Sequence, residues 1–411
     1  MDKLLRSHAD QIIRASIDAV LPDEAVKKAL AGQVFSGKVY LVSAGKAAWQ
    51  MAKAAWEILG SRIYKGVVVT KYGHCMGPIG DFACYEGGHP VPDENAFRGT
   101  QAALDMTASL NADDTVLFLL SGGGSALFEK PRISGEELQD ITGQLLASGA
   151  DIVQINTIRK RLSAVKGGRF AQHCAPAQVF SVVLSDVIGD RLDMIASGPA
   201  YPDLSTSAEA IAIARACGLS LSEKAWSLLE EETPKTLNNV TTKITGSVRQ
   251  LCKAAAEACQ NLGYTPVVLT DALNCQARDA GRMLAEKLRE NTGAGKSLAF
   301  IAGGETVVRL TGKGKGGRNQ EIALAAAIGI ADLTGAAVLS IGSDGTDGPT
   351  DAAGGYVDYE TAEALQRQSV DISAVLADND AYHALEKVNG LIFTGPTGTN
   401  VNDVAVALLK K

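Results

Sequence analysis

Short apolar runs recur along this chain of 411 residues, and each is followed by a glycine-containing break and a segment with helical spacing. Continuous apolar strands that alternate with helices are typical of a parallel sheet covered by helices on both faces. We therefore expect an α/β fold. The predicted strands lie at 38–46, 66–71, from 115 up to the glycines at 122–124, 178–190, 264–270, 297–302, 305–310 and 336–342. The predicted helices include 134–148, 154–165, 246–262, 274–291 and 319–332.

A change in composition suggests where the chain divides. At roughly 100–200 residues per domain, a chain of this length suggests two or three domains. A polar stretch at 232–245, which contains Pro234, interrupts the alternation of strands and helices. We take it as the boundary between a first domain at 1–235 and a second α/β domain at 240–411. The apolar stretch VAVALL near the C-terminus forms either a strand of the second domain or one that returns to the first.

Charge and residue counts exclude several classes of protein. The formal net charge of -7 argues against a nucleic-acid-binding protein that relies on a basic field. The Cys residues form no C-x-x-C pair and the His residues never pair at metal-ligand spacing, so no disulfide framework or zinc site is implied. The N-terminus reads as an amphipathic helix and not as a signal peptide, and the longest apolar run, 322–331, is far below the ~18 residues of a membrane span. We expect a cytoplasmic protein that binds neither nucleic acid nor membranes, and a homodimer is one option for its assembly.

Glycine is enriched, with 43 residues, and much of the enrichment follows predicted strands. The clearest case is the run Ser121, Gly122, Gly123, Gly124 and Ser125. Successive N–H groups without Cβ atoms can surround phosphate or carboxylate oxygens, and a following helix N-terminus adds a positive dipole. The alternative is a tight strand-to-helix turn, but three consecutive glycines lose more backbone entropy than a mere turn requires. The run is therefore predicted to bind an anion.

Cationic side chains follow other predicted strands. Lys46 begins a helix, where a lysine is unfavourable at the positive end of the dipole, and this favours a role toward a ligand over a merely solvated side chain. The loop 311–321, TGKGKGGRNQE, carries Lys313, Lys315 and Arg318. It has the spacing G-x-G-x-x-G, but no acidic residue follows about twenty positions later, as a dinucleotide fingerprint requires. We interpret it as a mobile cationic loop over phosphates, the alternative being a flexible surface hairpin.

Carboxylates follow two further predicted strands. Asp186 and Asp190 lie four residues apart, and Asp344 and Asp347 lie in a glycine-rich loop. Such pairs can hold Mg²⁺ or accept a hydroxyl proton. For each single Asp, an Asx turn or a helix N-cap is an equally good interpretation. His89, between two prolines, is expected to structure its loop, because no G-x-S-x-G elbow accompanies it.

Several long segments resemble a known family. Those that resemble the N-terminal region of class II glycerate 2-kinases are 87–95, 119–131, 156–171 and 185–199. Those that resemble the MOFRL module at the C-terminus of that family are 303–321, 343–354 and 395–404. The resemblance implies a Rossmann-like domain, with a mostly parallel sheet, and a smaller α/β domain, with the active site in the cleft between them. It also implies ATP-dependent phosphorylation of D-glycerate to 2-phospho-D-glycerate.

The resemblance also assigns roles to residues. It places the critical lysine of the family on Lys46, its critical arginine on Arg318 and its strand-end aspartate on Asp186, with Asp190 as the alternative. The resulting hypothesis is a kinase that binds ATP at the SGGGS run, helped by Lys313 and Lys315, and Mg²⁺ at Asp344 and Asp347.

A cation for the glycerate carboxylate is expected among Arg159, Lys160 and Lys166. The rival function is NAD(P)H-dependent reduction of hydroxypyruvate, because some relatives carry that older label. The poor dinucleotide fingerprint speaks against it. A ligand-binding sensor without turnover is the third class.

Overall fold

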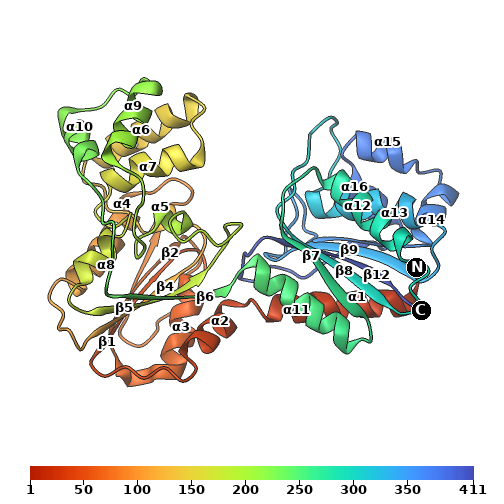
Figure 1. Cartoon of the computed structure of the whole chain (residues 1–411), viewed down its shortest axis with the longest axis horizontal. Helices are drawn as coiled ribbons and strands as arrows, with labels where there is room; N and C mark the ends of the chain where they lie inside the picture. Colours follow the sequence, from red (N-terminus) through yellow and green to blue (C-terminus); the bar gives the residue numbers. More distant parts are fainter. The chain divides into compact units, whose positions relative to one another are not determined.

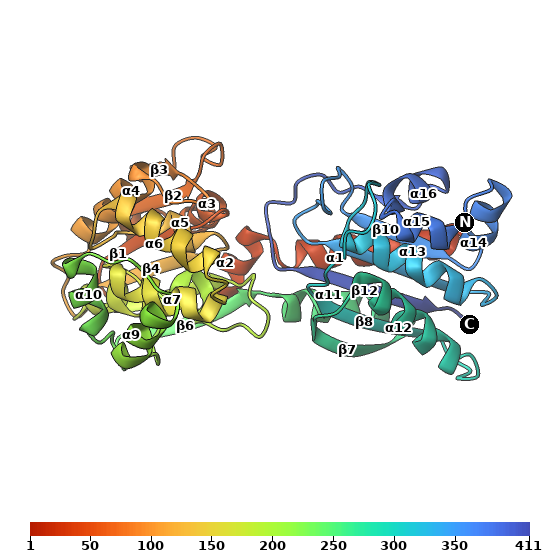
Figure 2. The same cartoon turned by 90° about the horizontal axis from the view of Figure 1, so that it is seen from above.

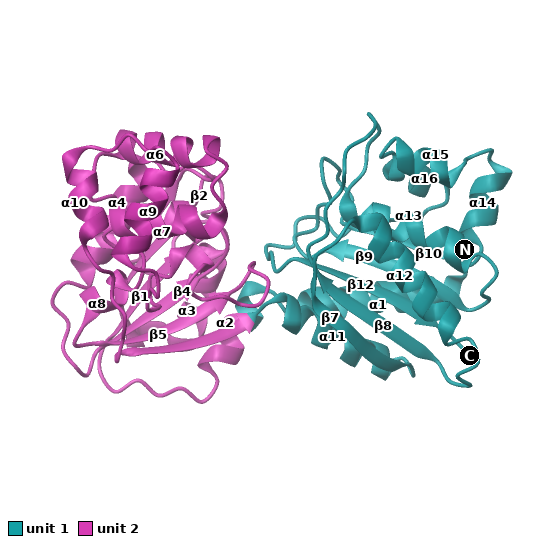
Figure 3. Ribbon diagram, turned by 45° about the horizontal axis from the view of Figure 1, so that its top comes forward, with its two compact units in different colours: residues 1–24, 246–411 teal, residues 25–245 magenta.

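Residues 1–411 are described by a computed structural model, whose helices and strands are labelled in Figure 1 and seen from above in Figure 2. The chain forms two compact units (Figure 3). We call Ala25–Thr245 the central unit, and Met1–Glu24 together with Gly246–Lys411 the terminal unit. Each contains one six-stranded sheet. None of the helices combines the length and the apolar character needed to cross a membrane.

The central unit is built on a sheet with the strand order β3-β2-β1-β4-β5-β6. Its strands are β1 (Val39–Ala44), β2 (Ile63–Lys71), β3 (Ala83–Gly87), β4 (Thr115–Leu120), β5 (Gln178–Leu184) and β6 (Val240–Gly246). The pairs from β3 to β5 are all parallel. From β1 the chain adds strands toward one edge, and from β4 toward the other. Loops that leave a sheet at such a switch point diverge and leave room for a ligand beyond the carboxyl ends of the strands.

Helices cover both faces of this sheet (Figure 1). Val42 and Phe118 belong to a buried cluster shared with α4 (Glu94–Met106) and α8 (Arg169–Cys174). Because side chains alternate along a strand, Leu41 and Leu117 point to the opposite face. There α3 (Ala48–Leu59) packs on β1, β2 and β4. The predicted α/β fold with a mostly parallel, doubly covered sheet is therefore confirmed.

A cluster of helices in the central unit has an apolar core of its own. Its members are α6 (Gly135–Ala147), α7 (Ile152–Leu162), α9 (Ser207–Ala216) and α10 (Glu223–Glu230). Each begins at a side-chain cap, from Ser134, Asp151, Thr206 and Ser222 respectively. The shorter helical segments of the unit are η1 (Gly60–Arg62), α5 (Gly124–Leu127) and η2 (Ile195–Ser197), and α2 (Pro22–Leu30) spans the division between the two units.

The terminal unit contains a mixed sheet with the order β11-β10-β9-β12-β8-β7. Its strands are β7 (Thr265–Leu273), β8 (Leu298–Gly304), β9 (Ala336–Gly342), β10 (Gly354–Asp358), β11 (Leu391–Ile392) and β12 (Asp403–Leu409). Only β7 and β8 pair in parallel, whereas β12 lies antiparallel between β8 and β9. The start of β12 therefore lies at the same edge of the sheet as the ends of β8 and β9.

Helices also cover both faces of the second sheet. The helices α12 (Ala277–Glu290) and α13 (Arg318–Ile330) pack side by side on one face, as both views show (Figure 1 and Figure 2). The helices α1 (Lys3–Asp18) and α11 (Val248–Asn261) contact each other and the other face. Three short helices complete the unit: α14 (Thr361–Arg367), α15 (Ile372–Ala377) and α16 (Ala381–Lys387).

One predicted strand is wrong. Residues 305–310 form no strand, and only Val307 makes an isolated bridge, to Gln276. The reason is that β8 is already bonded on both sides, by β7 and β12, and the backbone turns away at Gly304, where φ is 147°. The predicted strand at 178–190 likewise ends early, at Leu184.

The compact units differ from the predicted domains 1–235 and 240–411. Residues 1–24 pack with the second half of the chain, because the buried face of α1 contacts α11. The polar stretch at 232–245 contains β6, which belongs to the first sheet, so the division falls after Thr245. The stretch VAVALL lies in β12 and stays in the terminal unit.

Candidate active site

Two adjacent loops of the central unit are joined beyond the ends of β1 and β4. The Lys46 N–H donates to the Gly122 carbonyl oxygen at 2.8 Å, and the Ala47 N–H donates to Ser121 Oγ at 3.0 Å. The backbones pass so closely that a Cβ atom at Gly45 would lie 2.3 Å from Ser121 Oγ. Glycine at this position is therefore required by close approach, and by a φ of 121° as well.

The backbone of the glycine run leaves two N–H groups without a partner, and its binding of an anion stays a prediction. The backbone N–H groups of Gly122 and Gly123 donate no hydrogen bond to any other residue. Gly123 has a φ of 84°, in the left-handed region. Buried or half-buried N–H groups are almost always paired, so two consecutive free donors indicate a place where a ligand oxygen binds. We call Gly122 and Gly123 the nest.

Three chemically distinct side chains surround the nest. A Cβ atom at Gly123 would lie 3.1 Å from Cγ of Lys46 and 3.1 Å from Nε2 of His89, and one at Gly122 would lie 2.3 Å from Oδ2 of Asp186. The ammonium group of Lys46 makes neither a hydrogen bond nor an ion pair within the chain, so it is available to a ligand. Lys46 and the glycine run, which the sequence analysis singles out separately, thus lie side by side in the structure.

Asp190 is less well connected than Asp186. Its N–H donates to the Val187 carbonyl oxygen at 3.0 Å, which closes a turn, and its φ is 51°. Its Oδ1 is buried without a hydrogen-bond partner. No contact joins Asp190 to Lys46 or to the nest, so its catalytic role stays a prediction.

His89 is the residue that sequence reasoning missed in this unit. We expected it only to structure its loop, but the imidazole lies against Gly123. Burial lowers the pKa of His89, and Lys46, Lys71 and His74 lower it further. The sequence does contain one indication that His89 lies near the site, namely its position two residues after β3. Because β3 is parallel to β1 and β4, it ends at the same edge of the sheet.

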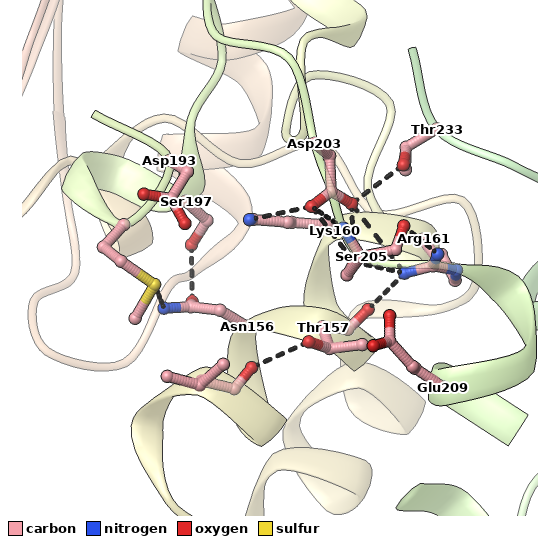
Figure 4. A network of polar contacts seen from close by, with 12 residues as sticks. Asn156, Thr157, Lys160, Arg161, Asp193, Ser197, Asp203, Ser205, Glu209 and Thr233 are labelled. Atoms are coloured by element: carbon pink, nitrogen blue, oxygen red, sulfur yellow. Dashed lines mark hydrogen bonds and ion pairs between the residues drawn. The ribbon is translucent and has the colours of Figure 1, made fainter. Parts of the chain in front are cut away.

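Two of the three cations expected to bind the glycerate carboxylate are occupied elsewhere. Lys160 is buried and its Nζ lies 3.1 Å from Asp203. In Figure 4 the side chains of Lys160 and Arg161 both point toward Asp203, which also accepts hydrogen bonds from Ser205 and Thr233. This network holds α7 to the segment before α9. Lys160 is therefore structural, contrary to the expectation.

Lys166 is also structural. It is fully buried, and its Nζ donates to the carbonyl oxygens of Ser125 at 2.9 Å, Phe128 at 3.2 Å and Ala196 at 3.4 Å. Burial lowers the pKa of Lys166 to about 8, although Glu129 at 3.4 Å acts in the opposite direction. Arg159, the third candidate, donates to the Ser125 carbonyl at 2.9 Å. The two cations therefore fix the turn that follows the nest.

The buried pair of Glu129 and Lys166 gives a stability prediction. Lys166→Met should lower the free energy of unfolding by about 3–5 kcal/mol, because it leaves the buried charge of Glu129 with only Arg159, at 3.8 Å, to offset it. The double variant Glu129→Gln/Lys166→Met should recover at least half of that loss, which urea unfolding measures. A double variant no more stable than the single one would show that the charge pair is not the source.

A second group of charged residues lies in the terminal unit, at the edge where β8 and β9 end and β12 begins. Arg318 opens α13, and its Nε and Nη2 donate to the carboxylate of Asp403 at 2.5 and 3.0 Å. Its Nη1 donates to Glu305 at 2.7 Å. Burial raises the pKa of Asp403 to about 6, and Arg318 opposes that rise. Asp403 is thus ionised at neutral pH and holds the guanidinium with a two-point contact.

Asp347 caps the same helix from a distant loop. Its Oδ1 accepts from the Asn319 N–H at 3.1 Å and its Oδ2 from the Gln320 N–H at 2.9 Å. Each carboxylate oxygen therefore accepts a backbone N–H at the start of α13, which gives Asp347 a capping role, and its binding of Mg²⁺ stays a prediction. Asp344 accepts from the Thr346 N–H at 3.0 Å through Oδ1. The described residues include no group of three or more His, Cys, Asp or Glu that could hold a metal. Asp344 as a metal ligand stays a prediction.

The cationic loop is hydrogen-bonded to the segment around Asp378 and Asp380, and its predicted mobility stays a prediction. The N–H groups of Lys313 and Lys315 donate to Asp378 at 3.0 Å and to Asp380 at 2.9 Å, and the Gly314 N–H donates to the Asp378 carbonyl at 2.8 Å. The Lys315 ammonium lies 3.8 Å from the ring centre of Tyr382. Together with the loops around Glu305, Asp344 and Pro349, this loop lines a cavity of about 710 Å³ that also reaches Arg318.

Sequence reasoning missed Asp403 and Glu305. Polar residues were expected after strands, whereas Asp403 is the first residue of β12, and Glu305 fell inside the strand predicted at 305–310. Only the antiparallel insertion of β12 between β8 and β9 brings Asp403 to the edge where Glu305 and Asp344 lie.

Comparison with known proteins adds independent evidence. A family model described as "Domain of unknown function (DUF4147)" matches residues 8–230, and the model of the MOFRL family matches residues 298–403. The chain is 52% identical over 411 residues to the D-glycerate 2-kinase of Thermotoga maritima, and the match covers 98% of each chain. A crystal structure of glycerate kinase from that organism matches with a TM-score of 0.95 at 51% identity, covering 99% of this chain and 100% of the other. A putative hydroxypyruvate reductase of Agrobacterium vitis is 35% identical over 420 residues, 98% of this chain and 94% of its own. This chain therefore belongs to the family of glycerate 2-kinases with a C-terminal MOFRL region.

Proposed function

We propose that this chain is a glycerate 2-kinase, which transfers the terminal phosphoryl group of ATP to the 2-hydroxyl of D-glycerate. Similarity over nearly the whole chain to a D-glycerate 2-kinase supports the substrate and the reaction. The structural observation that supports the proposal is the nest, whose two free N–H groups lie on the loop that the side chain of Lys46 approaches through Cγ, while the Lys46 ammonium is unpaired.

The central unit offers what phosphoryl transfer requires. Such transfer depends on positioning and charge stabilisation more than on covalent chemistry by the protein. The nest, within the run Ser121–Ser125, would bind oxygens of the ATP phosphates, and Lys46 would stabilise the charge that develops on the transferred group. Asp186, on the other side of Gly122, would orient or deprotonate the glycerate hydroxyl, with Asp190 as the second candidate.

The terminal unit offers a second, pre-oriented cation. Three of the five N–H groups of Arg318 are engaged by Asp403 and Glu305, so two remain for ligand oxygens. Because Asp403 fixes the guanidinium plane, little rotamer freedom is lost when a ligand binds. Lys313 would add positive charge at the same cavity, whereas the Lys315 ammonium lies over the ring of Tyr382, so a contact of Lys315 with phosphate stays a prediction. That one active site uses residues of both units stays a prediction, as do the homodimer and the cytoplasmic location.

Mg²⁺ is proposed as a partner of the nucleotide and not as a resident of a protein cage. When bound, it would neutralise charge on the phosphate oxygens of ATP. The residues present fit such a loosely held ion: Asp344 can supply one carboxylate, while nucleotide and water supply the other ligands. Asp347 is the weaker candidate, because each of its oxygens already accepts a backbone N–H and would share its lone pairs with the cation.

The reductase alternative follows from the name of one relative, and a specific contact argues against it. A dinucleotide bound at G-x-G-x-x-G places its pyrophosphate at the N-terminus of the following helix. In this chain that helix is α13, and the carboxylate of Asp347 already occupies its first N–H groups. A second anion at that position would meet both a filled site and a negative charge.

A pair of assays tests the proposed function. The purified chain is incubated with D-glycerate and MgATP while ADP is followed, and separately with hydroxypyruvate and NADH or NADPH while absorbance is followed. We expect glycerate-dependent ADP formation and no oxidation of either reduced cofactor. Cofactor oxidation without ADP formation would overturn the proposal in favour of the reductase. The absence of turnover in both assays, with binding retained, would favour a sensor.

A further inference from the structure

We propose that His89 is a further catalytic residue of this enzyme, whose ring nitrogen Nε2 hydrogen-bonds the anionic group held by the nest. The inference deepens the proposed function and rests on it for the identity of the reaction. Its starting point is geometric, because Nε2 and the side chain of Lys46 approach the same glycine, Gly123, from two different loops.

The imidazole has no other partner. His89 is half-buried, yet neither of its ring nitrogens makes a hydrogen bond within the chain. The remaining histidines, in contrast, all have a ring nitrogen bonded: His8 to Tyr264, His74 to the Lys46 carbonyl, His173 to the Leu104 carbonyl and His383 to Asp380. A polar group withdrawn from water is normally satisfied, so an unpaired one beside two free N–H groups points to a bound ligand.

The neighbouring charges identify the chemical class of that ligand. The groups that face the ring or its loop are Lys46, Lys71, His74, Asp93 and, across Gly122, Asp186. Asp93 is already occupied, since its carboxylate accepts from the Ala96 N–H and the Tyr72 hydroxyl. The side of the nest next to His89 is therefore cationic and rich in donors. An oxyanion fits it, either a nucleotide phosphate or the carboxylate of glycerate.

Binding of an anion should change the protonation of His89. In the free enzyme, burial and the nearby cations lower the pKa of His89, so the ring is neutral at pH 7. An anion in the nest offsets the charge of Lys46 and favours the protonated ring, which raises that pKa. Proton uptake by His89 would thus accompany ligand binding. The protonated Nε2 would then donate a hydrogen bond to the bound oxygens, in addition to the donors of the nest.

Nuclear magnetic resonance of the wild-type protein tests this inference without relying on turnover. The chain is labelled at histidine only, and the His89 ring signal is assigned by its loss in His89→Gln. We expect its titration midpoint to rise when MgADP or D-glycerate is added alone at saturating concentration. A rise with MgADP identifies the nest ligand as a phosphate, and a rise with D-glycerate identifies it as a carboxylate. An unchanged midpoint with both ligands would overturn the inference.

Kinetics gives an independent readout. His89→Ala should lower kcat/KM for glycerate phosphorylation by about 10- to 100-fold, the effect of losing one hydrogen bond to a charged group. His89→Gln, whose amide nitrogen can take the place of Nε2, should recover part of the loss. The matched control is His173→Gln, which concerns a histidine bonded to α4 and away from the nest. Wild-type kcat and KM in His89→Ala would contradict the inference. If the wild-type protein does not phosphorylate glycerate, the proposed function fails, while the resonance titration still decides whether His89 meets the anion.

Discussion

Lys46→Met should lower kcat for glycerate phosphorylation by about 10²–10³-fold, as expected for the loss of a group that stabilises charge at the transferred phosphoryl. The side chain has no acidic partner within the chain, so its removal breaks no ion pair. The free energy of unfolding should therefore stay within about 0.5 kcal/mol of the wild-type value. Steady-state kinetics and urea unfolding on the same preparations measure the two effects separately.

A matched control lies on the helix that Lys46 precedes. Lys53 on α3 is exposed and pairs with Glu57 one turn later. Lys53→Met makes the same chemical change about two turns away and should leave kcat and KM at wild-type values. If Lys46→Met were as active as Lys53→Met, the assignment of Lys46 to the reaction would be wrong.

Arg318→Met should reduce kcat by a comparable factor, about 10²–10³-fold, and Arg318→Lys should recover little of the loss. The reason is geometric: Arg318 uses Nε and Nη2 together on Asp403, and an ammonium group cannot make that two-point contact while also presenting donors to a ligand. Unlike the Lys46 variant, Arg318→Met also leaves Asp403 buried without its partner. It should therefore lower the free energy of unfolding by about 3 kcal/mol.

The double variant Arg318→Met/Asp403→Asn separates the two effects. Removing both charges should restore most of the stability, because no buried charge is left unpaired, but it should restore no activity. Activity that returned together with stability would contradict a direct role for Arg318 and leave it a structural residue.

The same pair predicts a pH dependence. Asp403 must be ionised to hold the guanidinium, and burial raises its pKa to about 6. Activity should therefore decline as the pH falls through about 6, and Asp403→Asn, which cannot titrate, should show lower activity without that limb. If the activity of Asp403→Asn declined at low pH with the same midpoint as the wild-type enzyme, the decline would be caused by the titration of another group.

Most of the fold follows from local pattern. The strands β1, β4 and β9 and the helices α6, α7 and α13 are visible as apolar runs and helical spacing, because each buries its apolar residues within one element. Two features depend on contacts between distant parts of the chain. The amphipathic α1 could pack on either unit, and nothing local specifies α11 as its partner. Likewise, an apolar strand such as β12 carries no mark of whether it pairs in parallel or antiparallel.

The same distinction between local pattern and distant contacts decides which site residues could be predicted. Lys46, the glycine run and Asp186 follow parallel strands directly, so a search beyond strand ends finds them. Asp403 was missed because it is the first residue of an antiparallel strand. Lys160 and Lys166 were overinterpreted, since a sequence does not reveal that a charged side chain is occupied by backbone carbonyls or by a buried partner.

The central claim is that this chain phosphorylates the 2-hydroxyl of D-glycerate at the site built around Lys46 and the nest. The most direct measurement is the proton-coupled ³¹P spectrum of the product formed from MgATP and D-glycerate by the wild-type protein and by Lys46→Met. Phosphate on carbon 2 couples to a single proton and gives a doublet, whereas phosphate on carbon 3 couples to a methylene pair and gives a triplet. We predict a doublet from the wild-type protein that is almost absent, at equal enzyme and time, from the variant. A triplet, or a doublet of equal intensity from both proteins, would contradict the account.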